Sequence, residues 1–222
     1  MAFTYPKIET LYNRDKRGIV IEGDYRNPLF PVVKYWQVTE KIDGTNVRVE
    51  LTENGEVNFY GRKENSQIPQ PLVNYLTKTF TKEKMQQLWL TDEKYPILLF
   101  GEGYGKGIQK AGEFYRSDVS FRLFDVAIFY HNRIIWLDWE DVKKFADKLQ
   151  INTVPFLGEA TLGEIMLMVK YGFYSTVAKE DNNRYDVVAE GVVARSPFYD
   201  RNGNRVIFKL KTKDFIVKKT EE

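Results

Sequence analysis

The sequence contains no cysteine and only one histidine, His131. The absence of cysteine excludes disulfides, thiolate metal sites and cysteine nucleophiles. A single histidine leaves no material for a histidine metal cluster or for a Ser-His-Asp arrangement. Any chemistry in this chain must therefore come from lysine, arginine, aspartate and glutamate.

A strong net charge and a long apolar run are also lacking. The 33 basic and 31 acidic residues leave a formal charge of +2, so contacts with nucleic acid should be local rather than spread over a basic surface. No apolar run approaches the roughly 20 residues that a membrane helix needs. The opening MAFTYPKIET has no apolar signal core. We therefore expect a cytoplasmic protein without membrane contacts.

The composition is that of a folded chain with a substantial core. Its 222 residues, 43% hydrophobic and 15% aromatic, suffice for one large domain or two small ones. Helical spacing of apolar residues predicts helices near 142–149 and 162–169 and a weaker one near 72–80. Stretches rich in β-branched and aromatic residues predict strands at 36–40, 47–52, 57–62, 97–102, 121–130, 187–195 and 206–211.

These elements favour a mixed, largely antiparallel α+β fold, because strands outnumber helices and do not alternate strictly with them. The Asn202-Gly203 pair between the last two strands predicts a hairpin. No internal repeat and no Pro/Gly/Ser-rich linker separates two halves of the sequence.

The segment EKIDGTNVR, residues 40–48, is the most informative in the chain. Lys41 stands at the end of an expected strand, and Gly44 is expected to supply the backbone dihedrals of a sharp turn after Asp43. As a nucleophile, Lys41 would need an unprotonated amine, which desolvation or neighbouring cations favour. Taken alone, the segment is better explained by a surface lysine before an ordinary Asp-Gly turn.

Further segments place carboxylates, an aromatic residue and lysines on expected strands. LFGEGYG carries Glu102, but its glycines are not spaced as G-x-G-x-x-G and no clear helix follows, which excludes a dinucleotide-binding loop. Phe121 opens FRLFDV and is either core or a platform for a nucleobase. AEGVVAR places Glu190 at the start of an apolar strand. Lys209 and Lys211 share one strand face, where phosphates are natural partners.

In this order, the five motifs resemble motifs I, III, IIIa, IV and V of the covalent nucleotidyltransferases, which comprise DNA ligases, RNA ligases and mRNA-capping enzymes. The closest resemblance is to RNA ligases of the phage nick-sealing type, whose motif I commonly reads Lys-x-Asp-Gly-x-Asn. Asn46 occupies that asparagine position, where DNA ligases and capping enzymes usually carry arginine. Residues 5–8 and 105–110 also resemble small RNA ligases. The motifs are Lys41-x-Asp43-Gly44, Phe100-Gly101-Glu102, Phe121-x-x-Phe124-Asp125, Glu190-Gly191 and Lys209-x-Lys211.

The resemblance implies a single nucleotidyltransferase (adenylation) domain over residues 1–222, built on antiparallel sheets with flanking helices. It implies an ATP-dependent RNA ligase that joins a 3′-hydroxyl to a 5′-phosphate, in nicked or single-stranded RNA. The implied intermediates are lysyl-AMP and an adenylylated 5′ end, and the implied cofactors are ATP and Mg²⁺ or Mn²⁺. Because Lys211 lies near the end of the sequence, no appended OB or helical domain is expected. Phages and viruses are typical sources of such a chain.

The resemblance also implies a role for each charged motif residue. Lys41 is the nucleophile that carries AMP, and Asp43 orients it or the metal, or simply fixes the turn. Lys209 and Lys211 take part in catalysis and bind the nucleotide phosphates. Glu190 belongs to the nucleotide site and helps to hold the divalent metal through its hard oxygen ligands.

The remaining implied roles concern the nucleoside. Glu102 would hold the ribose hydroxyls, and Glu40 and Asn46, within the Lys41 segment, would contact the nucleotide. Phe121 would stack on adenine. Phe124, three positions along and so on the opposite strand face, would then be core.

Two arginines are candidates for contact with nucleic acid. Arg62 is expected to bind the 5′-phosphate, and a solvated surface arginine is the alternative. Arg48 shares the strand face of Asn46 and is the second candidate. The rival functions are an ATP-dependent DNA ligase, against which Asn46 argues, and a relative that only binds nucleotide or nucleic acid. A pure binder has no need of an unprotonated lysine.

Overall fold

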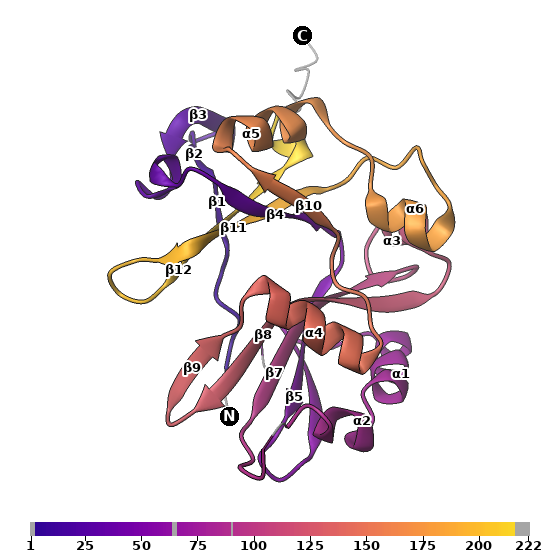
Figure 1. The fold of residues 1–222 in the computed structure, drawn as a ribbon. Helices are drawn as coiled ribbons and strands as arrows, with labels where there is room; N and C mark the ends of the chain where they lie inside the picture. Colours follow the sequence, from indigo (N-terminus) through magenta and orange to yellow (C-terminus); the bar gives the residue numbers. More distant parts are fainter. Residues whose placement is uncertain (1–2, 64–65, 90, 216–222) are drawn as a thin grey trace. The chain divides into compact units, whose positions relative to one another are not determined.

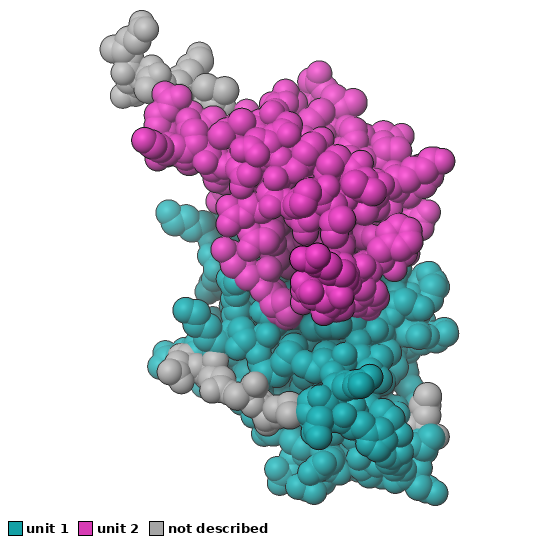
Figure 2. Space-filling view, turned by 90° about the vertical axis from the view of Figure 1, so that its left-hand side faces the viewer, with its two compact units in different colours: residues 1–5, 43–154 teal, residues 6–42, 155–222 magenta. Residues whose placement is uncertain are grey.

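The computed structural model describes residues 3–63, 66–89 and 91–215, which form two five-stranded sheets and a two-stranded ribbon (Figure 1). Contacts divide the chain into two compact units, coloured separately in Figure 2. Unit 1 contains residues 1–5 and 43–154, and unit 2 contains residues 6–42 and 155–222. The boundary between residues 42 and 43 splits the first motif, so Lys41 belongs to unit 2 and Asp43 to unit 1. The single domain expected over residues 1–222 stays a prediction.

Unit 1 is built on an antiparallel sheet with the strand order β6-β5-β7-β8-β9. Helix α4 begins at an Asp138 cap, whose side chain accepts a hydrogen bond from the Asp141 N–H, as helix N-termini favour. The strands are β5 (Thr45–Leu51), β6 (Val57–Gly61), β7 (Ile97–Gly105), β8 (Val119–Tyr130) and β9 (Arg133–Trp136). The helices are α1 (Gln70–Thr79), α2 (Lys82–Gln86), α3 (Gly112–Tyr115) and α4 (Trp139–Leu149).

Unit 2 is built on a sheet with the strand order β1-β12-β11-β4-β10, in which only the β1–β12 pair is parallel. Helix α5 begins with a capping box between Thr161 and Glu164. The strands are β1 (Glu9–Thr10), β2 (Tyr12–Arg14), β3 (Val20–Tyr25), β4 (Trp36–Lys41), β10 (Phe156–Ala160), β11 (Gly191–Tyr199) and β12 (Arg205–Lys211). The helices are η1 (Phe30–Val32), α5 (Leu162–Tyr171), α6 (Thr176–Asn182) and η2 (Thr212–Asp214).

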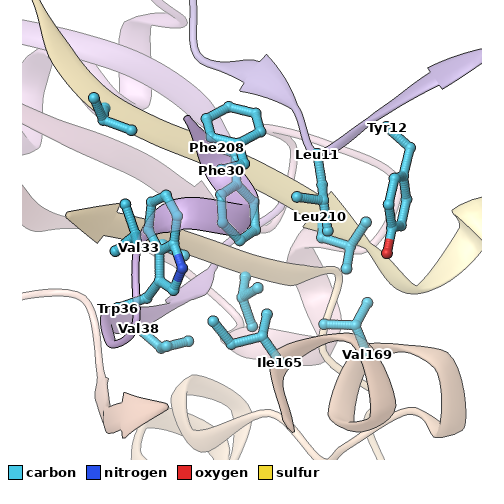
Figure 3. Packing of buried hydrophobic residues seen from close by; sticks show 13 residues of the cluster. Leu11, Tyr12, Phe30, Val33, Trp36, Val38, Ile165, Val169, Phe208 and Leu210 are labelled. Carbon is cyan, nitrogen blue, oxygen red and sulfur yellow. The ribbon is translucent and has the colours of Figure 1, made fainter. Parts of the chain in front are cut away.

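The core of unit 2 lies on one face of its sheet, where strand side chains pack against α5 and η1 (Figure 3). Trp36 and Phe208 meet at a ring-centroid distance of 4.7 Å, edge to face. Each fully buried side chain of this kind contributes about 1.5–3 kcal/mol. The alternate residues of β4, β11 and β12 that point to this face are Trp36, Val38, Val192, Ala194, Val206, Phe208 and Leu210. The intervening residues are thereby directed to the opposite face.

The α+β fold with largely antiparallel sheets is confirmed, as are the seven predicted strands and three predicted helices. Asn202-Gly203 lies in the β11–β12 turn, where Gly203 has a φ of 76°. The strand predicted from residue 187 begins only at Gly191, because Val187 and Ala189 hydrogen-bond to Ser175 and Phe173 instead. The missed elements are mostly short, and their sequences carry little periodicity; they are β1, β2, β3, β9, β10, α2, α3 and α6.

Candidate nucleotide-transfer site

In unit 2, the two lysines of the first and last motifs are brought together by strand register. Lys41 ends β4 and Lys211 ends β12, and both are paired with Gly191 at the start of the strand between them. Residues directly opposite in neighbouring strands project to the same face. The fold thus places two side chains 170 positions apart in the sequence (211 minus 41) on either side of one glycine.

Glu190 connects these two lysines. Its Oε2 lies 2.6 Å from Lys41 Nζ and its Oε1 lies 2.5 Å from Lys211 Nζ. The side chains of Lys41, Glu190 and Lys211 are 20%, 13% and 23% exposed, so the cluster is largely shielded but reachable. Two ammonium groups against one carboxylate leave one net positive charge, which suits an anionic ligand such as a phosphate.

Gly191 is required for this arrangement by its backbone. Its φ is 151°, and a Cβ there would lie 2.1 Å from the carbonyl oxygen of Leu210. No side chain fits at that distance. The preceding carbonyl, that of Glu190, accepts a hydrogen bond from the Thr212 N–H at 2.9 Å. The Glu-Gly motif therefore lets β11 approach β12 closely while its carboxylate faces the lysines.

Lys209 lies on the same face as Lys211. Its register partner Val193 is paired on the other side with Thr39, two residues before Lys41 in β4. The shared face of Lys209 and Lys211, predicted from the alternation of side chains, is therefore confirmed. This face is opposite to the apolar one that carries Val38 and Leu210.

Glu40 does not face this cluster. It is 1% exposed, and its Oε1 accepts a hydrogen bond from Ser175 Oγ at 2.5 Å. Its Oε2 accepts hydrogen bonds from the N–H groups of Thr176 and Val177 at 2.8 and 3.4 Å. A carboxylate is well placed at these unsatisfied N–H groups of the first turn of α6. The expected contact of Glu40 with the nucleotide conflicts with this placement, because the adjacent residue in a strand points to the other face.

In unit 1, Gly44 is needed for close packing rather than for unusual dihedrals. It is absent from the glycines with positive φ, which corrects the expected reason for its presence. A Cβ at Gly44 would lie 2.4 Å from the carbonyl oxygen of Gly103 and 2.8 Å from Cγ of Glu102. Asp43 is half-buried, and its N–H donates to the hydroxyl of Tyr115 at 3.4 Å. The turn is thus held against β7.

Glu102 and Asn46 are direct register partners in β7 and β5. Their side chains are therefore on one face, as the expected nucleotide contacts require. Both residues are half-buried. The Oδ1 atom of Asn46 is buried and has no hydrogen-bond partner among the described residues. A ligand that donates a hydrogen bond would relieve the cost of about 1–3 kcal/mol that such a group carries.

Arg48 and Arg62 differ in accessibility. Arg48 is 4% exposed, and its guanidinium lies 4.2 Å from the ring centroid of Tyr60. Its Nε is buried and has no hydrogen-bond partner among the described residues. Arg62 follows β6 directly and is exposed. A role of Arg62 in binding a 5′-phosphate stays a prediction, and direct contact of nucleic acid with Arg48 requires Arg48 to become exposed.

Phe121 is part of the core of unit 1. It is 1% exposed and packs edge to face on Phe80 with a centroid distance of 5.3 Å. Its Cζ lies 2.1 Å from where a Cβ of Gly101 would be, so it occupies the face of Gly101 and not that of Glu102. Stacking of Phe121 on an adenine whose ribose is held by Glu102 conflicts with this placement.

Phe124 also departs from its expected place. The register of β7 with β8 shifts between Phe100 and Gly101, whose partners are Asp125 and Leu123. Phe124 is thus the extra residue of a β-bulge, which changes the faces of the residues after it. Phe124 is half-buried, and its ring meets that of Tyr5 at 5.3 Å.

Two interactions in unit 1 were not anticipated. Arg122 is the register partner of Glu102, is 2% exposed, and donates from Nε to the hydroxyl of Tyr104 at 3.0 Å. Tyr5 donates its hydroxyl proton to Asp125 at 2.5 Å, which anchors the N-terminal segment in unit 1. Sequence alternation indicates a face, but not which residue of the next strand lies opposite, so neither pairing was predictable.

A divalent metal would need ligands from the substrate as well as from the protein. Among residues 3–63, 66–89 and 91–215, no group of three or more acidic or histidine side chains could hold a metal. Mg²⁺ commonly uses one or two carboxylates together with phosphate oxygens and water. Glu190 fits that requirement as a single hard oxygen ligand, although both its oxygens are already engaged by lysines.

The chain belongs to the RNA ligase family, whose family model matches residues 34–211. This match contains all five motifs. No curated protein sequence matches the chain significantly. None of the helices described in the structure is long and apolar enough to cross a membrane.

Solved structures of an RNA ligase from Naegleria gruberi share the fold. A variant with ATP and Mn has a TM-score of 0.60 and 17% identity, covering 93% of this chain and 57% of that one. The ligase with PPi has a TM-score of 0.62 and 19% identity, covering 95% and 62%. A variant with AMP and Mn has a TM-score of 0.62 and 18% identity, again covering 95% of this chain and 62% of that one. This chain therefore spans about 57–62% of the length of these ligases.

Proposed function

We propose that this chain is an ATP-dependent RNA ligase that carries AMP on Lys41. The observation that carries the proposal is the Lys41–Glu190–Lys211 cluster, with ion-pair distances of 2.6 and 2.5 Å and a Gly191 backbone that admits no side chain. Family membership and the presence of ATP, AMP or PPi in the Naegleria gruberi structures support this interpretation. An intracellular site of action is part of the proposal, since ATP is the substrate.

In the first step, Lys41 Nζ attacks the α-phosphorus of ATP. A nitrogen–phosphorus bond forms, and the bond from that phosphorus to the pyrophosphate oxygen breaks. Nζ must give up a proton to act as a nucleophile, and Glu190 Oε2, its hydrogen-bond partner at 2.6 Å, is placed to receive it. Lys209 and Lys211, on the same face, stabilise the negative charge that grows on the phosphates.

A bound divalent cation would add charge neutralisation at the phosphates, with Glu190 as its protein ligand. Because Glu190 also pairs with two lysines, phosphate entry must rearrange this cluster. Lys211 then exchanges its carboxylate partner for phosphate oxygens, while Lys41 keeps its hydrogen bond to Glu190 Oε2 until its proton has been transferred.

In the second step, the AMP passes from Lys41 to the 5′-phosphate of the nucleic acid, and Lys41 regains a free amine. In the third step, the adjacent 3′-hydroxyl attacks that phosphate and AMP leaves. We propose RNA on the 3′-hydroxyl side of the junction, because Asn46 occupies its RNA-ligase position in motif I. Only RNA offers a 2′-hydroxyl, which the protein can read directly. Arg62, exposed beyond β6, is the proposed contact of the 5′-phosphate.

The first experiment is incubation with ATP and Mg²⁺ or Mn²⁺, followed by intact-mass spectrometry. We expect one AMP adduct on the parent protein and none on Lys41→Ala. Lys34→Ala, at another lysine of unit 2, is the matched control and should keep the adduct. An unchanged adduct on Lys41→Ala would refute the nucleophile, and its absence from the parent would favour a relative that only binds nucleotide.

A second experiment separates RNA ligase from DNA ligase. Nicked duplexes and single strands with a 5′-phosphate would carry RNA or DNA separately on each side of the junction. We expect faster sealing when the terminal 3′ nucleotides are RNA. Equal or faster sealing with DNA in that position would refute the preference for RNA and favour the DNA-ligase alternative.

A further inference from the structure

The β11–β12 hairpin extends beyond the rest of its sheet. β11 is paired with β4 only as far as Arg195, which lies opposite Gln37. Beyond that point β11 pairs with β12 alone, ending at the Tyr199–Arg205 pair. Figure 1 shows the resulting two-stranded ribbon projecting from unit 2. We call residues 195–205 the hairpin arm.

The hairpin arm exposes two adjacent aromatic side chains. Phe198 is 61% exposed and Tyr199 is 53% exposed. They follow Pro197 in a stretch where the β11–β12 register is irregular, between Arg195 and Tyr199. An irregularity of this kind bends the strand and redirects its side chains. Exposed aromatic rings are poorly solvated and offer flat surfaces on which nucleobases can stack.

The charge of the arm matches a polynucleotide. It carries three arginines, Arg195, Arg201 and Arg205, and one acidic residue, Asp200. The Asp200 carboxylate is used within the turn, where it accepts hydrogen bonds from the Asn202 and Asn204 N–H groups and the Asn204 side-chain amide. Aromatic rings interleaved with arginines are the composition of a surface that tracks a nucleic-acid strand.

A second group of exposed aromatic residues lies elsewhere in unit 2. Tyr171 and Tyr174 are 83% and 67% exposed. Tyr171 follows Lys170, which pairs with Glu22 at 2.8 Å. Tyr171 is therefore a control for the loss of an exposed aromatic side chain outside the arm.

We propose that the hairpin arm binds the RNA substrate several nucleotides away from the junction, with bases on Phe198 and Tyr199 and phosphates on Arg201 and Arg205. This inference rests on the proposed function for the identity of the strand. Lys211 and Arg205 are six positions apart in β12, which at about 3.3 Å per residue is roughly 20 Å. At about 3.4 Å per stacked nucleotide this equals roughly six nucleotides.

The test measures RNA binding without ligation. The full chain would be titrated, without ATP, with single-stranded RNA that has a 5′-hydroxyl and a length of about 4 or 12 nucleotides, because only unpaired bases can stack on Phe198 and Tyr199. The variants are Phe198→Ser combined with Tyr199→Ser, and Arg201→Ala combined with Arg205→Ala. Tyr171→Ser is the matched control, and thermal unfolding establishes that each variant is folded.

We expect both arm variants to bind the 12-nucleotide RNA roughly tenfold or more weakly and the 4-nucleotide RNA as the parent does. The arginine variant should also show a shallower dependence of affinity on salt, by about one unit of slope per lost phosphate contact. Unchanged affinity of the folded variants for the 12-nucleotide RNA, or an equal loss of affinity for the 4-nucleotide RNA, would overturn the inference. Because this assay needs no adenylylation, failure of the AMP-adduct experiment leaves it interpretable.

Discussion

The motif residues of the two units differ in how their polar side chains are satisfied. In unit 2, Lys41 and Lys211 are matched by the two oxygens of Glu190. In unit 1, the Oδ1 of Asn46 and the Nε of Arg48 are buried without a hydrogen-bond partner among the described residues. A charge cluster that is matched within the protein is stable before the ligand arrives, and the ligand must exchange partners. An unmatched polar group costs stability until a ligand satisfies it.

This contrast has a functional meaning for a nucleotidyltransferase. Phosphates carry full charges, and lysines without a counter-ion would repel one another in the partly buried cluster. Glu190 removes that repulsion in the free protein. Neutral polar groups such as the Asn46 amide carry no such repulsion, so they can remain unpaired at a smaller cost. We therefore expect the largest losses of stability or activity from substitutions in the core and in the charged cluster, and the smallest from a substitution at Asn46.

Truncation of Phe121 tests whether this ring is core. Phe121→Ala should lower the free energy of unfolding by about 3–5 kcal/mol, because it empties the space beside Gly101 and Phe80. Phe124→Ala, at a half-buried position, should cost less. Urea unfolding measures both. In parallel, the folded variant Phe121→Leu should keep the KM for ATP of the parent; a large rise in KM without a loss of stability would restore the adenine-stacking role.

Removal of charge from the matched cluster, or from Lys209 on the same face of the sheet, tests the part of these charges in adenylylation. Glu190→Ala and Lys209→Ala should each slow formation of the AMP adduct by roughly a hundredfold or more, because each removes charge stabilisation that acts mainly in the transition state. Single-turnover rates with labelled ATP measure this, and Lys213→Ala in η2 is a nearby control. Rates of folded variants within a factor of about three of the parent would contradict these roles.

Glu40→Gln tests whether the Glu40 carboxylate stabilises the start of α6. The substitution keeps the shape of the side chain but removes a charge that accepts three hydrogen bonds at the start of α6. We expect a loss of about 1.5–3 kcal/mol in the free energy of unfolding. Glu159→Gln, at an exposed position of β10, should change it little. A stable Glu40→Gln variant with a greatly raised KM for ATP would instead show that Glu40 serves the nucleotide.

Asn46→Ala tests the unmatched polar group of unit 1. Because the substitution removes a buried oxygen that has no hydrogen-bond partner among the described residues, the free energy of unfolding should not fall, and loss of the unpaired group should raise it by up to about 1–3 kcal/mol. The rate of sealing pre-adenylylated RNA should nevertheless fall by roughly tenfold if the substrate supplies the missing partner. Urea unfolding and single-turnover sealing test the two statements. A loss of stability above about 1 kcal/mol would mean that Asn46 is structurally engaged.

Much of the architecture was predictable because it depends on local patterns. Alternating apolar residues in β4, β11 and β12 indicated the core face and, with it, the common face of Lys209 and Lys211. The same reasoning failed at Phe124, where a bulge changes the alternation although β8 itself contains no glycine or proline to signal it. It also failed for Glu40, since the helix that it caps lies 135 residues further along the chain.

The sequence by itself determined which groups can act: lysines, carboxylates and glycines in five ordered motifs, in a chain without cysteine and with a single histidine. Only the tertiary structure decided which of them meet. Strand register brought Lys41 and Lys211 to the two sides of Gly191, and β7–β5 pairing set Glu102 beside Asn46. The physical reason is that register depends on hydrogen bonds between distant segments, and a shift of one residue moves every side chain to the other face.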